Sequence, residues 1–251
     1  GTPWLCATLT TCSRGATPHP ANVRIYGEDL YYGDLLNSIK EFGILRPIII
    51  DRKKRVIDGT RRLATAKVIG LETVPCEIRE FEDEDQAVSA ILTYNRYRQK
   101  TPRQIFNESR ELKRIETEKA QRRKEHKPIS AEALKGQVRD ILSTFFKMGH
   151  TKFEELEAVF EAEDAHPEIA EKVANETWSV HRGFTALKKR VEKQDKDSRK
   201  RKKIKSELSK VNRPSLSKAL EEKYLGEGVD LEKVKLEDIR TEIKRGLGNT
   251  A

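Results

Sequence analysis

Residues 43–70 read GILRPIIIDRKKRVIDGTRRLATAKVIG, and this stretch decides the fold. The apolar run Ile48–Ile50 predicts a buried strand, and Val56–Ile57 predicts the second strand of a hairpin. Asp58 and Gly59 end that strand, and Thr60 is then expected to cap a helix that runs to a stop at Gly70. The stretch therefore predicts a strand hairpin followed directly by a helix.

The start of this helix has the features of an anion-binding site. First-turn amides carry partial positive charge, Gly59 lets a ligand approach the backbone, and Arg61 or Arg62 offers a guanidinium fork for phosphate. The same residues also fit a plain surface turn with two solvated arginines, because one glycine and two arginines form a weak motif. From the residues alone, both interpretations stay open.

Several motifs in a fixed order resemble the N-terminal domain of ParB-type partition proteins and their ParB/sulfiredoxin-like relatives. The matching pieces lie within residues 35–50, 56–66 and 70–75. Upstream, Pro18–Arg24 resembles the family's first box, and downstream Tyr94–Arg98 stands where the family has Glu-Asn-x-x-Arg. The resemblance covers residues 17–101. It implies an α+β N-terminal ParB/sulfiredoxin-like domain, followed by an all-α helix-turn-helix region and a helical C-terminal tail.

The resemblance also implies a ligand. ParB-type proteins are CTP-dependent switches in which nucleotide binding closes two N-terminal domains around DNA. The residues that would hold CTP, or another nucleotide with Mg²⁺, are Gly59, Thr60, Arg61, Arg62, Asn95 and Arg98. Thr60 and Tyr94 stand where the family has glutamates, which removes groups for orienting the metal or a water. Nucleotide binding is therefore expected, weak hydrolysis stays open, and no catalytic residue can be named. The sulfiredoxin branch is disfavoured because Cys76 lies on a different element from the arginines.

Composition sets the class of partner and the compartment. Charged residues make up 36% of the 251 residues, and the net charge of +9 favours a polyanionic partner. No apolar run approaches the roughly 18 residues of a membrane span, and no signal segment is recognisable. Three cysteines without a CxxC pair and five scattered histidines argue against a metal site and for a reducing compartment. The sequence thus predicts a cytoplasmic protein with no membrane segment.

The same signals divide the chain into four predicted parts. Residues 1–98 form the expected nucleotide-binding domain, and residues 99–128 a connecting helix or partner-binding arm outside the core, starting at Thr101-Pro102. Residues 129–192 form a helical DNA-binding domain, and residues 193–251 a basic linker with a C-terminal helical segment.

Within the first part, local patterns predict further elements. Residues 1–16 are expected to hold one strand over Leu5–Thr11 or to be a tail, and residues 17–33 to be a loop closed by Gly33. Asp34 is expected to cap a helix that ends at Gly43, with Leu35, Ile39 and Phe42 on its inner face. A strand is expected at Val74–Ile78, and the acids of residues 82–85 predict the start of a helix that buries Val88, Ile91 and Leu92.

Residues 138–160 have the pattern of a helix-turn-helix motif. An apolar stripe of Val138, Ile141, Leu142 and Phe145 precedes a tight turn at Lys147–Thr151. A second helix then follows with Phe153, Leu156, Val159 and Phe160 inward. The predicted DNA-facing residues are Lys147, His150, Thr151 and Lys152. Arg182 is added to them from Trp178–Phe184, which resembles the segment that closes the helix-turn-helix domain of ParB-type proteins. Glutamates on the second helix oppose this assignment, so three-helix packing without a DNA role stays open.

The C-terminal quarter is strongly basic. Lys188–Lys205 holds eleven Lys or Arg residues against three acids, which fits either a solvated helix or contacts to phosphates. The predicted phosphate contacts are Arg199, Lys200, Arg201, Lys202 and Lys203. The apolar positions Leu231, Val234, Leu236, Ile239 and Ile243 predict a small dimerising helix.

Together these features predict a ParB-like DNA-binding protein that acts as a homodimer on double-stranded DNA. Its expected role is plasmid, viral or chromosome partition or transcriptional regulation, and a ParA-type ATPase is a further partner that the resemblance allows. The competing class is an enzyme of the same fold, a nuclease or small-molecule kinase, or a component of a DNA-modification system. Such an enzyme needs clustered acids or a His–Asp pair beside the anion site, where only Asp58 is close.

Overall fold

A computed structural model describes residues 8–13, 15–27, 33–124, 140–211 and 214–248. The chain divides into two compact units, residues 1–181 and residues 182–251. The boundaries expected at residues 98, 128 and 192 stay predictions.

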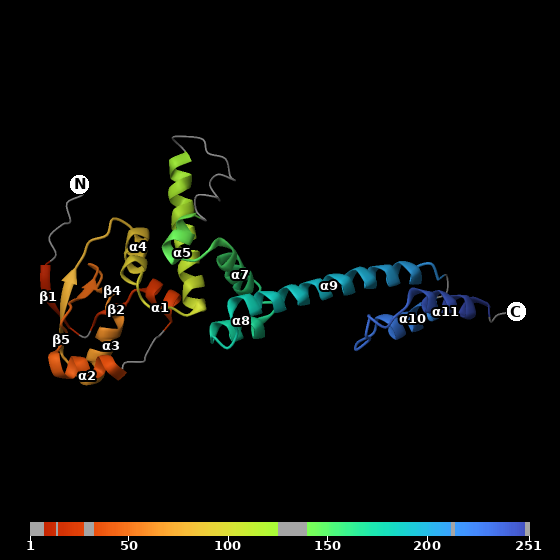
Figure 1. Cartoon of the computed structure of the whole chain (residues 1–251), viewed down its shortest axis with the longest axis horizontal. Helices are drawn as coiled ribbons and strands as arrows, with labels where there is room; N and C mark the ends of the chain where they lie inside the picture. Colours follow the sequence, from red (N-terminus) through yellow and green to blue (C-terminus); the bar gives the residue numbers. More distant parts are fainter. Residues whose placement is uncertain (1–7, 14, 28–32, 125–139, 212–213, 249–251) are drawn as a thin grey trace. The chain divides into compact units, whose positions relative to one another are not determined.

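Unit 1 is built on a five-stranded mixed sheet with the strand order β1-β5-β3-β4-β2 (Figure 1). The strands are β1 (Thr8–Ser13), β2 (Thr17–Pro18), β3 (Ile48–Ile50), β4 (Arg55–Asp58) and β5 (Thr73–Ile78). The predicted hairpin is confirmed, because β3 pairs antiparallel with β4. β3 also pairs parallel with β5, and β1 closes the far edge antiparallel to β5. Of the strand expected over Leu5–Thr11, the part before Thr8 lies outside the described residues.

Both faces of β3 are covered by helices, which explains its unbroken run of isoleucines. Ile49 points into a core with α1 (Pro20–Tyr26) and α4 (Glu84–Tyr94). Ile48 and Ile50 point to the opposite face and pack with Leu63 and Ala66 of α3 (Thr60–Ile69). The sheet therefore lies between α1 and α4 on one side and α3 on the other.

Three details at the start of the chain differ from the expectation. Residues 20–26 form helix α1 rather than loop, because Pro20 occupies its first turn and the His19 side chain accepts a hydrogen bond from Ala21 N. Helix α2 (Gly33–Phe42) begins at Gly33, and the Asp34 side chain lies outside the described residues. Ile39 is buried as expected, but Phe42 is 60% exposed, so its place on the inner face was wrong.

Helix α3 begins one residue earlier than the capping rule suggests. Gly59, not Thr60, is the N-cap residue, and its φ of +95° explains why a glycine stands there. Gly70 ends the helix as predicted. Helix α4 also starts as predicted, with the Asp83 side chain accepting from Gln86 N at 2.7 Å, and its residues Val88, Ile91 and Leu92 are buried.

Helix α5 (Pro102–Lys124) begins after Thr101 as predicted, but it is not outside the core. Phe106, Leu112 and Ile115 are buried, and α5 packs against α1, α4, α7 (His150–Glu161) and α8 (Pro167–Ala174). This burial was not predicted because most residues of α5 are polar. A single narrow apolar stripe is enough to bury one face of a helix that has neighbours on two sides.

Residues 140–146 are helical and α7 follows after a turn, as the sequence predicted, but the turn covers residues 147–149 because α7 already begins at His150, inside the predicted turn. Phe153, Leu156, Val159 and Phe160 are all buried. Leu142 is buried too, but Ile141 is 40% exposed, and Val138 lies outside the described residues. The α+β domain followed by helices is thus confirmed, while the DNA role of α7 stays a prediction.

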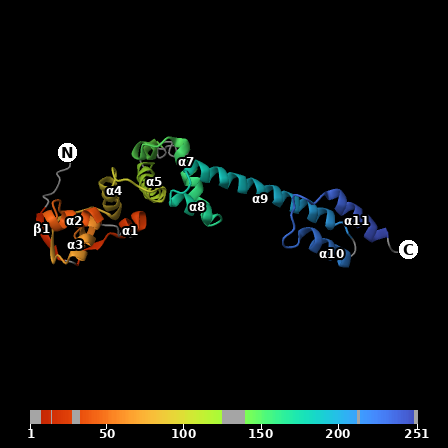
Figure 2. The ribbon, with the colours of Figure 1, turned by 60° about the horizontal axis from the view of Figure 1, so that its bottom comes forward.

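Unit 2 begins within α9 (Val180–Leu208) and contains α10 (Pro214–Leu225) and α11 (Leu236–Gly248). Both views show α10 and α11 beside the C-terminal end of α9 (Figures 1 and 2). The core of this unit consists of Ile204, Leu208, Leu220, Leu231 and Ile239. The apolar residues expected to form a dimerising helix are therefore packed, wholly or partly, inside the unit, and Leu231 and Val234 lie before α11 and not in it, so that part of the expectation was wrong. The dimer itself stays a prediction.

Across the described residues, no helix combines the length and the apolar character needed to cross a bilayer.

Candidate functional site

A cavity of about 800 Å³ opens at the start of α3. Residues from α1, α2, β4 and α3 and from the loop after α4 line it. All six residues predicted to bind a nucleotide are among them: Gly59, Thr60, Arg61, Arg62, Asn95 and Arg98. The fold therefore brings together the central stretch and the Tyr94–Arg98 segment, which are far apart in the sequence.

The wall formed by α3 is the positive end of a helix dipole. No side chain caps this end, and the first helical hydrogen bond runs from Leu63 N to Gly59 O at 2.9 Å. The amides ahead of Leu63 belong to the first turn, where an anion is stabilised. The positive φ favours glycine at position 59, and an added Cβ would lie 3.0 Å from Arg62 Nη2, so the Arg62 side chain would have to shift to make room for it.

Arg62 lines the cavity, but most of its hydrogen-bond donors bind other groups of the protein. Its guanidinium donates to Asp58 Oδ2 at 2.7 Å and to the carbonyls of Arg46 and Pro47 at 2.5 and 2.9 Å. Three of its five N–H groups thus hold the chain that enters β3 against the start of α3. Arg61 is exposed, and it also lines an adjoining cavity of about 620 Å³.

Arg98 lines the cavity from the loop after α4, and contacts to α1 and α5 hold this loop in place. Its Cζ lies 5.2 Å from the centre of the Tyr26 ring, and the Tyr26 hydroxyl donates to the Glu108 carboxylate. Lys100, two residues further along the loop, donates to the same carboxylate at 2.6 Å. Glu108 is fully buried, and this burial raises its pKa, as burial also raises the pKa of Tyr26. The buried Glu108 carboxylate therefore fixes both the ring beneath Arg98 and the loop that carries it.

Asn95 is held by its own helix. It is the C-cap residue of α4, and its Nδ2 donates to Ile91 O at 2.9 Å. The side-chain amide is thus oriented by α4 at the edge of the cavity.

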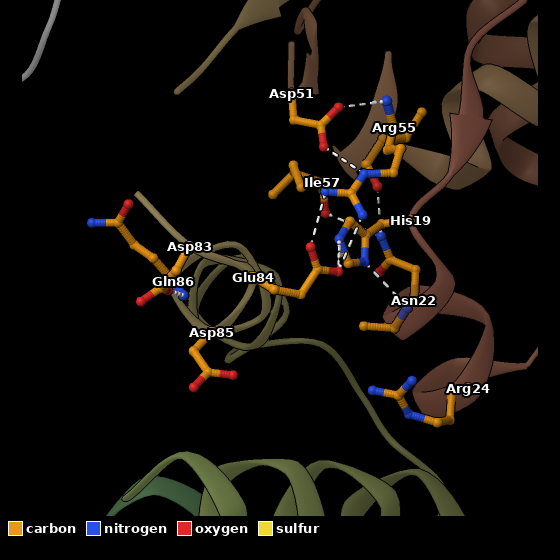
Figure 3. Close-up of polar contacts among 12 residues, drawn as sticks. His19, Asn22, Arg24, Asp51, Arg55, Ile57, Asp83, Glu84, Asp85 and Gln86 are labelled. Carbon is orange, nitrogen blue, oxygen red and sulfur yellow. Dashed lines mark hydrogen bonds and ion pairs between the residues drawn. The ribbon is translucent and has the colours of Figure 1, made fainter. Parts of the chain in front are cut away.

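A polar network around His19, Arg55 and Glu84 was not foreseen from the sequence (Figure 3). Arg55 donates to Asp51 Oδ2 at 2.6 Å and bridges both oxygens of Glu84 at 3.1 Å. His19 Nε2 lies 2.9 Å from Glu84 Oε1, an ion-pair distance without hydrogen-bond alignment. Asn22 donates from Nδ2 to Val56 O at 2.8 Å and so ties α1 to β4.

This network gives the Pro18–Arg24 box a structural role. Burial, followed by the positive charge of Arg55, lowers the pKa of His19, so its imidazole is neutral. The hydrogen bonds from Arg55 lower the pKa of Glu84. Together these contacts place Pro18 and Asn22 in the wall of the cavity. A histidine cap and a histidine–glutamate contact across 65 positions leave no local pattern that sequence reasoning could use.

Comparison with known proteins agrees with this architecture. Residues 24–95 match the family model described as ParB N-terminal domain. YnaK of Escherichia coli, a "ParB-like nuclease domain-containing protein", is 32% identical over 59 residues, which are 24% of this chain and 67% of that protein. The chain belongs to the ParB N-terminal domain family.

Longer relatives of the ParB N-terminal domain match over shorter shares of their length. "Stage 0 sporulation protein J" of Bacillus subtilis is 33% identical over 69 residues, 26% of this chain and 24% of that protein. A "Probable chromosome-partitioning protein ParB" of Mycobacterium leprae is 30% identical over 84 residues, 30% of this chain and 25% of that protein. The chain thus spans about a quarter of the length of these relatives. A solved Pnob8-like ParB-N domain shares the fold, with a TM-score of 0.50 and 17% identity over 95% of this chain and 98% of that one.

Within this ParB N-terminal domain, carboxylates are scarce at the cavity. Asp58 is the sole carboxylate among the described residues that line it, and it pairs with Arg62. Tyr94 does not line the cavity. Its hydroxyl bonds instead to Arg79, which also pairs with Glu77. Across the described part of the chain, no cluster of three or more His, Cys, Asp or Glu side chains is arranged to hold a metal ion.

The predicted DNA-binding residues fall into two sets that belong to different units. Lys147, His150, Thr151 and Lys152 are exposed at the turn before α7 and in its first turn. His150 Nε2 lies 3.8 Å from Asp140 Oδ1, and the nearby Glu155 contacts His181 Nδ1 at 2.8 Å. The second set, with Arg182, lies on α9 in unit 2.

Two members of the α9 set have structural contacts. Lys200 donates to Glu232 O and Arg201 to Leu225 O, each at 3.2 Å, so both hold α9 to the rest of unit 2. Arg199, Lys202 and Lys203 are exposed.

The net charge of the chain is concentrated in unit 2. Residues 182–251 hold 21 of the 50 Lys and Arg residues and 12 of the 41 Asp and Glu residues. This balance of +9 equals the net charge of the whole chain, so residues 1–181 are neutral overall.

Proposed function

We propose that the ParB N-terminal domain binds a nucleotide, with CTP as the first candidate, in the cavity at the start of α3. The observation that carries this proposal is the convergence of all six predicted residues on one cavity. Its volume of about 800 Å³ lies within the range of about 300–1,000 Å³ that is usual for ligand sites. The uncapped start of α3 receives the phosphates, and the guanidinium groups of Arg61 and Arg98 balance their charge.

Isothermal titration of the full chain with CTP, ATP and GTP, with and without Mg²⁺, tests this proposal. Binding of at least one nucleotide is expected, and Arg61→Ala should weaken it at least tenfold. A matched control is Arg52→Ala, because Arg52 is exposed and does not line the cavity. Absence of heat from all three nucleotides would refute nucleotide binding.

Bound nucleotide stays intact on this proposal. Hydrolysis needs a group that orients water or metal, and the carboxylate of Asp58 is occupied by Arg62 at 2.7 Å. Phosphate release measured with saturating CTP and Mg²⁺ should stay at the rate of the protein-free control. Release that depends on the purified chain and is lost with Asp58→Asn would contradict this and favour an NTPase.

The nuclease or kinase alternative receives less support. A histidine does lie near the site, but His19 is only 1% exposed, and its Nδ1 accepts from Ala21 N. It is therefore a cap and not an available base. Cleavage of supercoiled plasmid by the purified chain with Mg²⁺, abolished by Asp58→Asn, would favour the nuclease.

The second part of the proposed function is binding of double-stranded DNA through unit 2, in a homodimer that serves partition or transcriptional regulation. Support comes from the +9 charge of residues 182–251 and from the exposed cations of α9. Each phosphate contact contributes about −0.9 to the slope of log affinity against log salt. The double variant Lys202→Gln/Lys203→Gln should therefore flatten this slope by about 2, whereas Lys40→Gln/Lys53→Gln in unit 1 should leave it unchanged. Equal slopes for all three proteins would exclude this face of α9.

A further inference from the structure

The segment Tyr94–Lys100 holds two tyrosines and three cationic residues, and these residues have different surroundings. Arg98 and Lys100 face Tyr26 and the buried Glu108, as described above. Arg96 and Tyr97 are exposed instead. The outward half of the segment has no part in the proposed nucleotide cavity, because neither Arg96 nor Tyr97 lines it.

Tyr97 is the most exposed large hydrophobic side chain among the described residues, at 84%. An aromatic ring so exposed leaves a wide apolar face in water, an arrangement that marks interaction surfaces when polar groups rim it. One cation lies beside this ring, since Lys147 Nζ is 5.9 Å from its centre. A second cation, Arg96, directly precedes Tyr97 in the chain and has its Cζ 5.4 Å from the centre of the Phe145 ring.

The position of Lys147 depends on an uncommon backbone conformation. Its φ is +51°, in the left-handed region that non-glycine residues rarely adopt. Such conformations persist where the surrounding structure enforces them, and they concentrate at functional sites. Lys147 follows the helix of residues 140–146 in this conformation, and its ammonium lies beside the ring of Tyr97.

An open aromatic face beside cations is the arrangement that binds a strand of unpaired nucleic acid. The base stacks on the ring while the phosphates on either side meet the cations. Duplex DNA suits the surface less well, because its bases are stacked on one another and present only their edges in the grooves. We propose that Tyr97, Arg96 and Lys147 bind single-stranded nucleic acid, with one unpaired base stacked on Tyr97.

This surface adds a second nucleic-acid ligand to the duplex binding assigned to unit 2. It lies beside the predicted DNA-facing residues of the α7 turn, since Lys147 belongs to both. The proposal does not depend on nucleotide binding, because the residues that carry it are not cavity residues.

Fluorescence anisotropy with a labelled 20-nucleotide oligothymidine and a duplex of equal length tests the proposal. The full chain is measured at one salt concentration in the background Lys202→Gln/Lys203→Gln, which reduces binding by α9. Tyr97→Ala should weaken oligothymidine binding about tenfold, the size of one lost base–aromatic stack, and leave duplex binding unchanged. Tyr97→Phe keeps the ring and should bind like the parent.

The matched control is Phe42→Ala, which removes another exposed aromatic ring, on α2, and should change neither affinity. Thermal unfolding of each variant confirms that the fold is intact. The proposal is overturned if the parent does not bind oligothymidine, or if Tyr97→Ala binds it like the parent. Equal weakening of both ligands would mean a contact to the duplex backbone and would overturn it as well. A change in self-association with unchanged nucleic-acid binding would identify a protein contact instead.

Discussion

Replacing Arg62 with alanine should destabilise unit 1, although Arg62 lies in the wall of the proposed nucleotide site. The substitution removes three hydrogen bonds, to Asp58 and to the carbonyls of Arg46 and Pro47. A hydrogen bond contributes about 1 kcal/mol net, and the half-buried ion pair with Asp58 adds less than a fully buried one would. The expected loss is therefore about 2–3 kcal/mol, and a unit of this size loses roughly 2–4 °C of Tm per kcal/mol.

Thermal unfolding followed by circular dichroism measures this effect, with an expected drop of about 5–10 °C in Tm for Arg62→Ala. Arg62→Lys should recover part of the loss, since an ammonium can keep the Asp58 contact but cannot bridge both carbonyls. Arg61→Ala is the matched control, and a change within about 0.5 kcal/mol is expected because Arg61 is exposed. The reasoning fails if Arg62→Ala unfolds at the parental temperature and loses nucleotide binding, because Arg62 would then be a ligand arm and not a structural tie.

Three further predictions follow from the polar contacts of unit 1. The pKa of His19 is lowered in the folded state, so the unfolded chain binds more protons just below pH 6.5 and stability should fall as the pH drops through this range. Urea unfolding at pH 7.5 and 5.5 measures this loss of stability, which should be smaller for His19→Asn than for the parent. An equal loss in both proteins would exclude His19 as the cause. Glu108→Gln leaves the buried ammonium of Lys100 without its carboxylate and should lower the free energy of unfolding by about 3–5 kcal/mol. The double variant Lys100→Met/Glu108→Gln removes both charges and should unfold at a higher urea concentration than the single variant. The reverse order would mean that the ion pair does not hold the loop. Gly59→Ala places a Cβ 3.0 Å from Arg62 at a φ of +95°, so the free energy of unfolding should fall by roughly 1–3 kcal/mol in the same assay. Parental stability would show that the loop can relax.

The central hairpin and α3 could be predicted because their signals are local. Ile48–Ile50 and Val56–Ile57 are apolar runs bounded by charged or turn residues, and Gly70 ends the helix that follows. Helix α1 could not be predicted in this way, because its cap is a histidine, which also lies 2.9 Å from Glu84, a residue of another helix. The capping rule for Ser, Thr, Asp and Asn does not include that case.

In the candidate site, too, some features follow from local sequence patterns and others depend on contacts between distant segments. Its residue types at the start of α3 are visible in the sequence, and the resemblance to ParB-type proteins adds Asn95 and Arg98. The different tasks of Arg61 and Arg62 are not visible, because the carbonyls that hold Arg62 belong to Arg46 and Pro47 on a separate segment. The same holds for unit 2, where the spacing of Leu236, Ile239 and Ile243 on α11 fits either a dimer contact or packing inside the unit.

The central claim is that the phosphates of a nucleotide bind at the start of α3. An ¹⁵N–¹H correlation NMR titration of the full chain with CTP, and then with ATP, tests it most directly, because it reports on single backbone amides. The largest shift changes are predicted for Thr60 and Arg61 in the first turn of α3, with smaller changes at Arg98. Shift changes confined to the lysines of α9, or no change at saturating nucleotide, would contradict the claim.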